Sequence, residues 1–449
     1  MAQTRPYVID TLRLAGPVAL SRLGIIGMAL VDVIAVGQFA PDELPHQALG
    51  WAPTAVFLVA AIGLLQGVQV LAARSLGEKN PLGAGVALRR GLVLALVAGV
   101  ISALLMSLAG KNLFTLFGIE EALAAPSAKV MAVLAISIPL HLVYIAATYF
   151  LEAIKKPGIS TGVMWAANVI NLALNVWWVP DFGAVGSAWA TVGARVFLAV
   201  AILAAIWFLR DRAVYGVRTL GAEGPSYRAL LAVGIAAAVS QAVEAGAFSA
   251  MTVIAGRIGA DVVAAYQILL NVMALVFMIA LGTGAASGVL VSEAIGRRAP
   301  ADAARAGWTG LGINTIGMLI AALVVLVFAH PISRIYTADA NLALLIASMM
   351  WVCALVLTPD GGQVVAAYAL RARGDNWFPT FSHILSYALV MPVLGFWLAE
   401  REGMGVAGLL LAIFWSSVLS VSILLARWWW LTRADTLPPL LEGRGQGTG

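Results

Sequence analysis

Residues 240–248 read Ser-Gln-Ala-Val-Glu-Ala-Gly-Ala-Phe, and they lie inside an apolar run from about Arg228 to Gly256. A transmembrane helix needs about 20 apolar residues, so this run is long enough to cross a bilayer. Glu244 falls near its middle. A carboxylate at mid-membrane costs several kcal/mol unless it is neutralised, paired or hydrated. We therefore expect Glu244 to serve a function.

The composition of the whole chain predicts a polytopic membrane protein. Hydrophobic residues make up 61% of the 449 residues and charged residues 11%, with a mean hydropathy of +0.95. A soluble domain has about 45–50% apolar and about 25% charged residues. The one cysteine, Cys353, excludes a disulfide or a thiolate metal site within the chain. The net charge of +5 forms no basic stripe, so we expect no nucleic-acid partner. We also expect no cofactor other than a coupling ion, Na⁺ or H⁺.

Hydropathy windows predict an all-α protein with twelve transmembrane helices. These spans cover residues 14–38, 48–72, 88–109, 128–152, 159–179, 184–209, 229–257, 262–290, 307–329, 342–369, 379–399 and 404–430. The termini and the loops on their side hold 20 of the 27 Lys and Arg residues, the opposite loops hold five, and Arg22 and Arg195 lie within spans. The positive-inside rule therefore predicts that both termini are cytoplasmic.

The sequence also predicts that the chain is duplicated. One constant offset, which we call the repeat offset, pairs Ser21 with Ser240, Gly37 with Gly256, the loop 77–81 with 296–300, Tyr149 with Tyr368 and Leu151 with Leu370. Near the end a slightly larger offset pairs Gly183 and Gly186 with Gly405 and Gly408. Two halves of six spans share one orientation and are related by an axis along the membrane normal. The predicted domains are an N-lobe at 1–212, a cytoplasmic linker at 213–228, a C-lobe at 229–433 and a cytoplasmic tail at 434–449.

Polar residues in the first half are typical of a cation site. Asp32 lies in span 1, and span 5 carries Asn168, Asn171 and Asn175 at a spacing that places them on one helix face. Span 6 adds Thr191. Carboxylate, amide and hydroxyl oxygens suit a hard cation such as Na⁺, or a hydrated proton. The alternative interpretation is that the amides only join neighbouring helices.

The second half contributes Glu244 in span 7 and Asp360 in span 10. Asp360 follows Pro359 and precedes two glycines, so we expect a bend in the helix at this acid. Neither acid has a basic residue close to it in its own span, which favours a functional role over a structural ion pair. Ser240 and Gln241 lie one turn before Glu244 on a shared face.

Other polar and sulfur-containing residues have simpler interpretations. The histidines are scattered, so we expect interfacial or core positions for His46, His141, His330 and His383. We expect ion pairing or snorkelling for Arg22 and Arg195, with substrate contact as the less favoured alternative. Methionines can line an adaptable drug pocket, although core packing is the commoner role for Met251, Met273, Met278, Met349 and Met350.

Together these residues resemble the MATE (multidrug and toxin extrusion) family, in its bacterial NorM-like branch, over residues 10–427. The resemblance rests on Val31-Asp32, the loop 77–81, Glu244, Asp360 with the segment Gln363-Val364-Val365, and Leu370-Arg371. It implies two six-helix lobes and antiport of a cation against an organic drug. It also implies a cation site, with Na⁺ as the candidate ion, at Asp32, Asn171, Asn175 and Thr191, and coupling acids at Glu244 and Asp360. Some members have a Tyr one turn before the span-10 acid; Val356 stands there in this chain, which leaves Na⁺ and H⁺ both open.

The leading hypothesis is a monomeric, multi-pass protein of the bacterial inner membrane that exports organic cations in exchange for Na⁺ or H⁺ by alternating access. The candidate substrate-contacting residues are Met28, Ser240, Gln241, Phe248 and Gln363. A flippase for lipid-linked precursors is the alternative, but it needs a basic cavity, and acids dominate within these spans. No nucleotide loop or histidine pair points to an enzyme or an ATP-driven pump.

Overall fold

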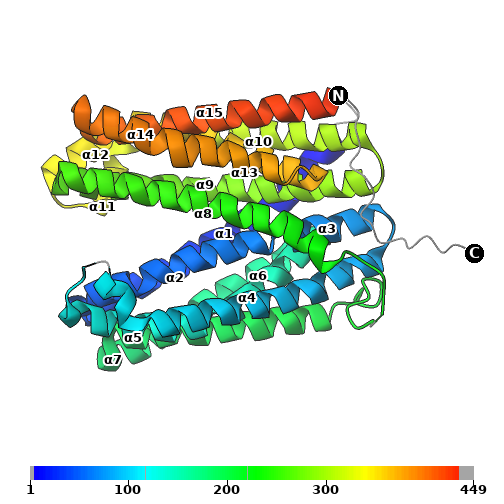
Figure 1. Cartoon of the computed structure of the whole chain (residues 1–449), viewed down its shortest axis with the longest axis horizontal. Helices are drawn as coiled ribbons and strands as arrows, with labels where there is room; N and C mark the ends of the chain where they lie inside the picture. The colour runs from blue at the N-terminus through cyan, green and yellow to red at the C-terminus, as the bar shows by residue number, and fades with distance from the viewer. Residues whose placement is uncertain (1–4, 117, 220, 434–449) are drawn as a thin grey trace, which may run out of the picture. The chain divides into compact units, whose positions relative to one another are not determined.

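The computed structural model describes residues 5–116, 118–219 and 221–433, and these residues form helices and short connections (Figure 1). The predicted tail 434–449 lies outside the described residues. The helical segments are α1 (Arg5–Phe39), η1 (Pro41–Glu43), α2 (Leu44–Leu64), α3 (Gln66–Gly77), α4 (Pro81–Leu116), α5 (Glu121–Ile136), α6 (Ile138–Ala153), α7 (Pro157–Trp207), α8 (Tyr227–Ile258), α9 (Ala260–Gly296), α10 (Pro300–Val327), α11 (Ala329–Tyr336), α12 (Ala340–Arg373), α13 (Trp377–His383), η2 (Ile384–Val390), α14 (Met391–Gly395), η3 (Phe396–Arg401) and α15 (Gly405–Arg433).

Eleven helical stretches of the described chain are long and apolar enough to cross a membrane. The longest, Pro157–Trp207, contains a reversal at Gly183, whose φ of 54° and ψ of −136° are not helical. A Cβ added at Gly193 would lie 2.7 Å from Leu174, so the chain folds back on itself after Gly183. The two arms of α7 are the predicted spans 5 and 6, and the twelve-helix prediction is confirmed.

The described residues fall into two compact units. The first unit contains Leu20–Ala238, and the second unit contains residues 5–19 and 239–433. Two long helices therefore belong to both units: α1 changes unit after Ala19 and α8 after Ala238. The repeat offset pairs Ala19 with Ala238, so each helix passes from one unit to the other at the equivalent position of its half.

Backbone conformation supports the duplication. Lys79 and Arg298, which the repeat offset pairs, have left-handed φ values of 58° and 60°. The same offset pairs Lys155 (φ 60°) with Gly374 (φ 105°), and the larger offset near the end pairs Gly183 (φ 54°) with Gly405 (φ 56°). Non-glycine residues adopt this conformation uncommonly, so matched occurrences indicate matched turns.

In the first unit the predicted linker packs against the start of α4. Arg89 donates to the carbonyl oxygen of Gly216, and Arg90 donates to that of Pro225. The Arg90 guanidinium also lies 5.3 Å from the centre of the Tyr227 ring. The domain boundaries predicted at 212 and 229 stay predictions, since the first unit of the structure continues to Ala238.

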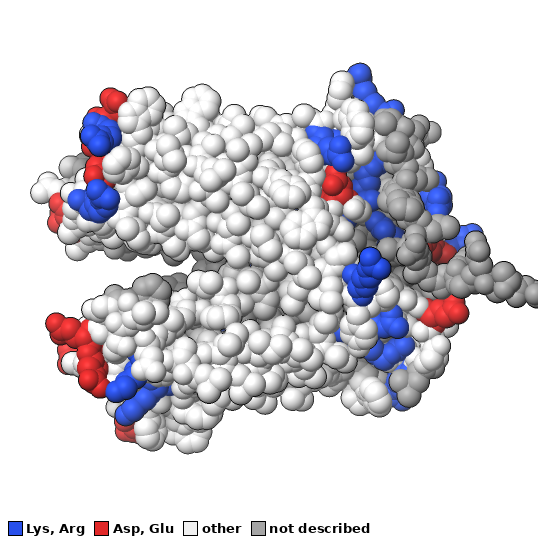
Figure 2. All heavy atoms as spheres, in the orientation of Figure 1, with Lys and Arg blue, Asp and Glu red and all other residues white. Residues whose placement is uncertain are grey.

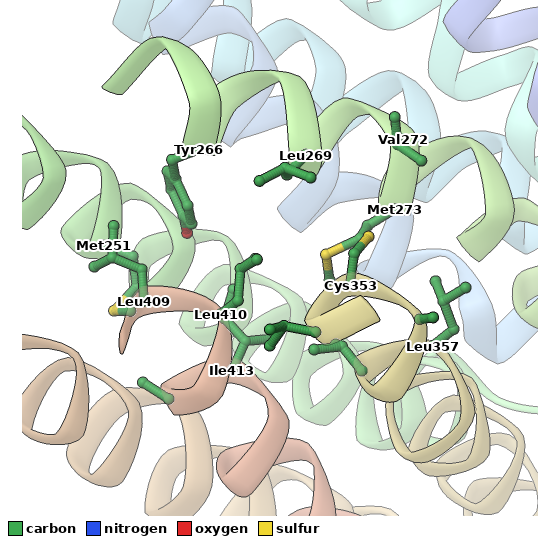
Figure 3. Close-up of a cluster of buried hydrophobic side chains, with 14 of the residues drawn as sticks. Met251, Tyr266, Leu269, Val272, Met273, Cys353, Leu357, Leu409, Leu410 and Ile413 are labelled. Carbon is green, nitrogen blue, oxygen red and sulfur yellow. The ribbon is translucent and has the colours of Figure 1, made fainter. Parts of the chain in front are cut away.

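The second unit has a large apolar core contributed by α8, α9, α12 and α15 (Figure 3). Met251, Met273 and Met350 belong to this core and are at most 5% exposed, which matches the core interpretation of these methionines. In each unit the charged side chains gather at the ends of the helices and leave an uncharged band between them (Figure 2). That band is the part of the surface suited to lipid.

Candidate functional site

The first unit holds Asp32 in a buried polar cluster. The Asp32 side chain is 9% exposed. Its Oδ1 accepts hydrogen bonds from Nδ2 of Asn171 at 2.9 Å and of Asn175 at 2.7 Å, and its Oδ2 accepts one from Oγ1 of Thr191 at 2.5 Å. The structure thus brings together all four residues that the sequence analysis assigned to this cation site.

The reversal at Gly183 positions these partners. Asn171 and Asn175 lie one turn apart on the first arm of α7, and Thr191 lies on the second arm. Asn168 does not join them, because its Nδ2 donates to the carbonyl oxygens of Gly24 at 3.0 Å and Met164 at 2.9 Å. Asn168 therefore joins α7 to α1, as the alternative interpretation of the asparagines described.

The two amides present nitrogen, not oxygen, to the carboxylate. The Oδ1 atoms of Asn171 and Asn175 are buried and have no hydrogen-bond partner among the described residues. Rotating each amide by a half-turn brings both oxygens towards Asp32, which gives the oxygen donors that a hard cation requires. The described residues contain no cluster of three or more His, Cys, Asp or Glu side chains that suits a metal ion. The carboxylate, amide and hydroxyl oxygens at Asp32 fit Na⁺ or a proton better than a transition metal.

Arg195 continues this cluster along the second arm of α7, one turn after Thr191. Its Nη1 donates to Oγ of Ser137 at 2.8 Å, and its guanidinium carbon lies 5.7 Å from the centre of the Trp51 ring. The guanidinium is close enough for its charge to act on Asp32. The sequence analysis did not link Arg195 to Asp32, although the spacing 191–195 on one helix face pointed that way.

The second unit holds two carboxylates joined by one amide. Nε2 of Gln363 lies 3.5 Å from Oε1 of Glu244, at the limit of a hydrogen bond, and Gln363 also bonds Asp360. Glu244 is half-buried, Asp360 is 7% exposed and Gln363 is fully buried. The two carboxylates lie close enough to interact electrostatically. Such a pair attracts a proton or another cation, because two adjacent negative charges disfavour each other.

Two hydroxyl groups that the sequence analysis missed complete this second cluster. Oδ1 of Asp360 accepts from the Tyr387 hydroxyl at 3.2 Å and from Oγ of Ser417 at 3.1 Å. Val356, the position at which the family resemblance allowed a Tyr, lies in the apolar core and is fully buried. The phenol next to Asp360 is therefore supplied from η2 instead of α12. The helix α12 continues through Pro359, and the bend expected there stays a prediction.

The other candidate residues lie in different surroundings. Oγ of Ser240 lies 2.6 Å from Nδ1 of His383, and Phe248 stacks on Tyr387 with ring centres 6.5 Å apart. Gln241 is half-buried in the second unit, and Met28 is 6% exposed in the first unit. Arg371, three turns after Asp360 on α12, acts electrostatically on Glu244. This basic residue comes from another helix, so an inspection of the span that contains Glu244 could not reveal it.

A groove of about 490 Å³ also lies in the second unit, between α10, α12 and α15. Its lining residues are mostly apolar and include Trp308, Pro359 and Phe414. None of the candidate substrate or cation residues lines it. We therefore assign it no part in the site.

A duplicated helical chain that crosses the membrane twelve times and buries carboxylates among polar partners in each half has the architecture of a membrane transporter. The comparison with protein families identifies which kind. The MatE family profile matches residues 17–177 and 236–397, two segments whose first residues the repeat offset pairs. The chain belongs to the MATE family.

Curated relatives agree with this family over nearly the whole chain. A "Probable multidrug resistance protein NorM" of Caulobacter vibrioides is 42% identical over 94% of this chain and 91% of its own length. A protein of the same description from Deinococcus radiodurans is 30% identical over 94% of this chain and 95% of its own length. The "Multidrug resistance protein NorM" of Burkholderia vietnamiensis is 29% identical over 94% of this chain and 93% of its length.

Solved structures share the fold at lower identity. A structure described as the outward-facing conformation of a multidrug resistance MATE family transporter superposes with a TM-score of 0.88 at 19% identity, over 96% of this chain and 97% of that chain. A eukaryotic MATE transporter superposes with a TM-score of 0.86 at 16% identity, over 96% and 98%. The protein is thus a multi-pass membrane protein with the MATE fold.

Proposed function

We propose that this protein is a multidrug efflux transporter that exports organic, often cationic, drugs in exchange for H⁺ or Na⁺ by alternating access of its two units. The proposal is supported by the family, by relatives that are described as multidrug resistance proteins, and by buried carboxylates in both units. Its coupling residues are Asp32 in the first unit and the Glu244–Asp360 pair in the second unit.

The observation that carries the proposal is the environment of Asp32. Three donors from two arms of one helix converge on a carboxylate that is 9% exposed. Binding a proton or Na⁺ at this carboxylate lowers the number of hydrogen bonds that it accepts, because a neutral or ion-bound carboxylate has fewer free acceptor sites. The change loosens the link between α1 and α7, which is how occupancy at Asp32 can alter helix packing. Both units would bind their cation in one step of the cycle and release it in another.

The pair in the second unit suits the same role with a different geometry. Gln363 joins Glu244 to Asp360, and the aromatic ring of Phe248 lies beside Tyr387. An anionic pair next to aromatic faces favours a lipophilic cation. We propose that a cationic drug and the coupling ion compete for these acids.

The buried arginines favour drug efflux over the flippase alternative. Arg22 forms an ion pair with Glu152 at 3.2 Å, and Arg195 bonds Ser137 and acts on Asp32. Both guanidinium groups are thus engaged with acids or hydroxyls inside the first unit. A carrier of lipid phosphates would need such groups available to its cargo.

The test is drug efflux from proteoliposomes under separately imposed H⁺ and Na⁺ gradients. We expect one gradient to drive efflux of an organic cation such as ethidium. Asp32→Asn and Glu244→Gln should each reduce gradient-driven efflux at least about tenfold, because each removes an ionisable carboxylate with little change of shape. Drug-binding affinity measured without a gradient should fall less than efflux does.

Two exposed carboxylates provide matched controls: Asp42→Asn in η1 and Glu402→Gln after η3. Both variants should transport like the parent. Full gradient-driven efflux in both Asp32→Asn and Glu244→Gln would contradict the coupling assignment. If neither gradient drives flux of any organic cation in the parent, the antiport proposal itself fails.

A further inference from the structure

The first unit contains a line of buried polar residues that drug binding does not account for. Ser137, His141, Tyr144, Thr148 and Glu152 recur once per turn and lie on one face of α6 and its preceding residue. Each of them is at most 2% exposed. Fifteen residues of helix span about 22 Å, most of the hydrocarbon thickness of a bilayer. We call these five residues the α6 polar line.

One end of the α6 polar line meets the Asp32 cluster. Ser137 accepts a hydrogen bond from Arg195 at 2.8 Å. Arg195 follows Thr191 by one turn, and Thr191 bonds Asp32 at 2.5 Å. Two side chains of α7, one turn apart, therefore lie between Asp32 and the start of the α6 polar line, and the Arg195 charge acts on Asp32.

The other end of the line is a second buried carboxylate. Oε1 of Glu152 lies 3.2 Å from Nη2 of Arg22, and its Oε2 accepts from Nε2 of Gln69 at 2.6 Å. Lys155 and Lys156 follow three and four residues later, in a loop of the predicted cytoplasmic side. The α6 polar line thus leads from Asp32 towards the cytoplasmic end of the first unit in the predicted orientation.

His141 is the residue of this line that core packing explains least. Neither ring nitrogen has a hydrogen-bond partner among the described residues, although the side chain is 2% exposed. Its ring centre lies 6.0 Å from that of Tyr144. The charged groups that act on it are Arg195 from α7 and Arg22 from α1. Buried polar atoms that lack a partner usually mark bound water or a functional role.

The duplication gives an independent reason to single out His141. The repeat offset places His141 over Asp360, Tyr144 over Gln363 and Glu152 over Arg371. The same face of the equivalent helix therefore carries Asp360 and Gln363, the part of the second unit's acid cluster that lies on α12. Each half has a titratable side chain at this position, an acid in one half and a histidine in the other.

We propose that the α6 polar line is a proton relay, with His141 as its carrier, which connects Asp32 to Glu152. The inference rests on the proposed function, in which Asp32 exchanges a coupling ion, and it assigns a proton to that ion. The imidazole accepts a proton at one ring nitrogen from the Asp32 side and releases the proton of its other nitrogen towards Tyr144 and Glu152. The ring then regains its starting form by rotation, so no net charge stays on it. Water completes the hydrogen-bonded chain where neighbouring side chains are not in contact.

The test compares His141→Gln with His330→Gln in proteoliposomes under an imposed H⁺ gradient. Gln keeps a polar side chain of similar length. Its amide cannot accept a proton at one atom and release a proton from another, as the two ring nitrogens of His141 can. We expect His141→Gln to slow proton-driven efflux about 10- to 100-fold, the usual range for a lost proton-transfer group, while the drug-binding Kd stays within about twofold. Added imidazole should restore part of the rate. The control residue His330 is exposed on α11, and its variant should match the parent.

Thr148→Val supplies a second variant of nearly unchanged volume should His141→Gln fail to fold. It removes one hydroxyl of the α6 polar line and should also slow proton-driven efflux without altering Kd. Parental rates in both variants, or efflux of the parent that runs on a Na⁺ gradient alone, would overturn the relay. The variant Asp32→Asn distinguishes the relay proposal from the assignment of Asp32 as a coupling residue. Loss of coupling in Asp32→Asn with parental rates in His141→Gln defeats the relay alone, whereas coupling retained in Asp32→Asn defeats the assignment of Asp32.

Discussion

Gly63 and Gly282 hold equivalent positions in the two halves, and each lies against one of the two helices that belong to both units. A Cβ added at Gly63 would lie 2.8 Å from Cα of Ala238 on α8, and one at Gly282 would lie 2.6 Å from the carbonyl oxygen of Ala15 on α1. Both contacts are with backbone atoms, which cannot shift unless the whole helix moves. Close helix approaches of this kind are the common use of glycine in membrane proteins.

We therefore predict that Gly63→Ala and Gly282→Ala each lower stability by about 1–3 kcal/mol, the usual cost of overpacking. The measurement is thermal unfolding of the purified protein in detergent. Gly312→Ala is the matched control on α10, because a Cβ there would meet nothing within 4 Å. Melting temperatures of the two variants equal to that of Gly312→Ala would show that these helix crossings are looser than the structure indicates.

A second prediction concerns the hydroxyl of Thr191. Thr191→Val keeps the shape of the side chain but removes the donor that lies 2.5 Å from Asp32. We expect gradient-driven efflux to fall about tenfold, the equivalent of one lost hydrogen bond to a charged group, and Thr191→Ser to restore most of it. Transport kinetics in proteoliposomes measure this effect. Thr161→Val is the control on the same helix, since the Thr161 hydroxyl bonds the carbonyl oxygen of Pro157 within its own turn.

A third prediction separates the phenol of Tyr387 from its ring. Tyr387→Phe removes the hydroxyl that lies 3.2 Å from Asp360 but preserves the ring that packs against Phe248 and His383. We expect the concentration of coupling ion needed for half-maximal efflux to change about three- to tenfold, because Asp360 loses one of its two hydroxyl donors. The apparent KM for drug should change less. Equal effects on ion and drug would instead assign the hydroxyl to drug binding.

Most of the fold followed from local features of the sequence. Hydrophobic runs of bilayer length indicated the twelve spans, and two of these spans meet at Gly183, where α7 reverses direction. The repeat offset identified the duplication because turn residues such as Lys79 and Arg298 must adopt the same backbone conformation in both halves. The division of α1 and α8 between the two units was not predictable, because it depends on packing between segments that are distant in the sequence.

The candidate sites were also predicted only in part from the sequence. Helical spacing placed Asn168, Asn171 and Asn175 on one face, and the resemblance to the family then selected Asn171, Asn175 and Thr191 as the partners of Asp32. Tyr387 and Ser417 were missed because their contact with Asp360 joins three different helices. Each is nevertheless a hydroxyl-bearing residue inside a predicted span, so a search for polar side chains in the apolar runs could have found them. His141 was assigned to the core or an interface, and its burial agrees with the core.

The last prediction tests the buried pair of Arg22 and Glu152. Arg22→Met leaves Glu152 buried beside the Gln69 amide without the Arg22 charge, and we expect a loss of about 3–5 kcal/mol of stability, the usual cost of breaking a buried ion pair. Removing both charges, in Arg22→Met with Glu152→Gln, should recover most of that loss, because no uncompensated charge then stays buried. Thermal unfolding of the two single variants and the double variant gives the coupling energy directly.

The same double variant distinguishes stability from transport. If Glu152 only balances Arg22, the double variant should recover proton-driven efflux together with its melting temperature. If Glu152 also receives protons from the α6 polar line, efflux should stay low although the protein is stable, because a Gln side chain cannot take up a proton near neutral pH. We expect the second result, since Glu152 is the only carboxylate that stands on this line of five buried residues.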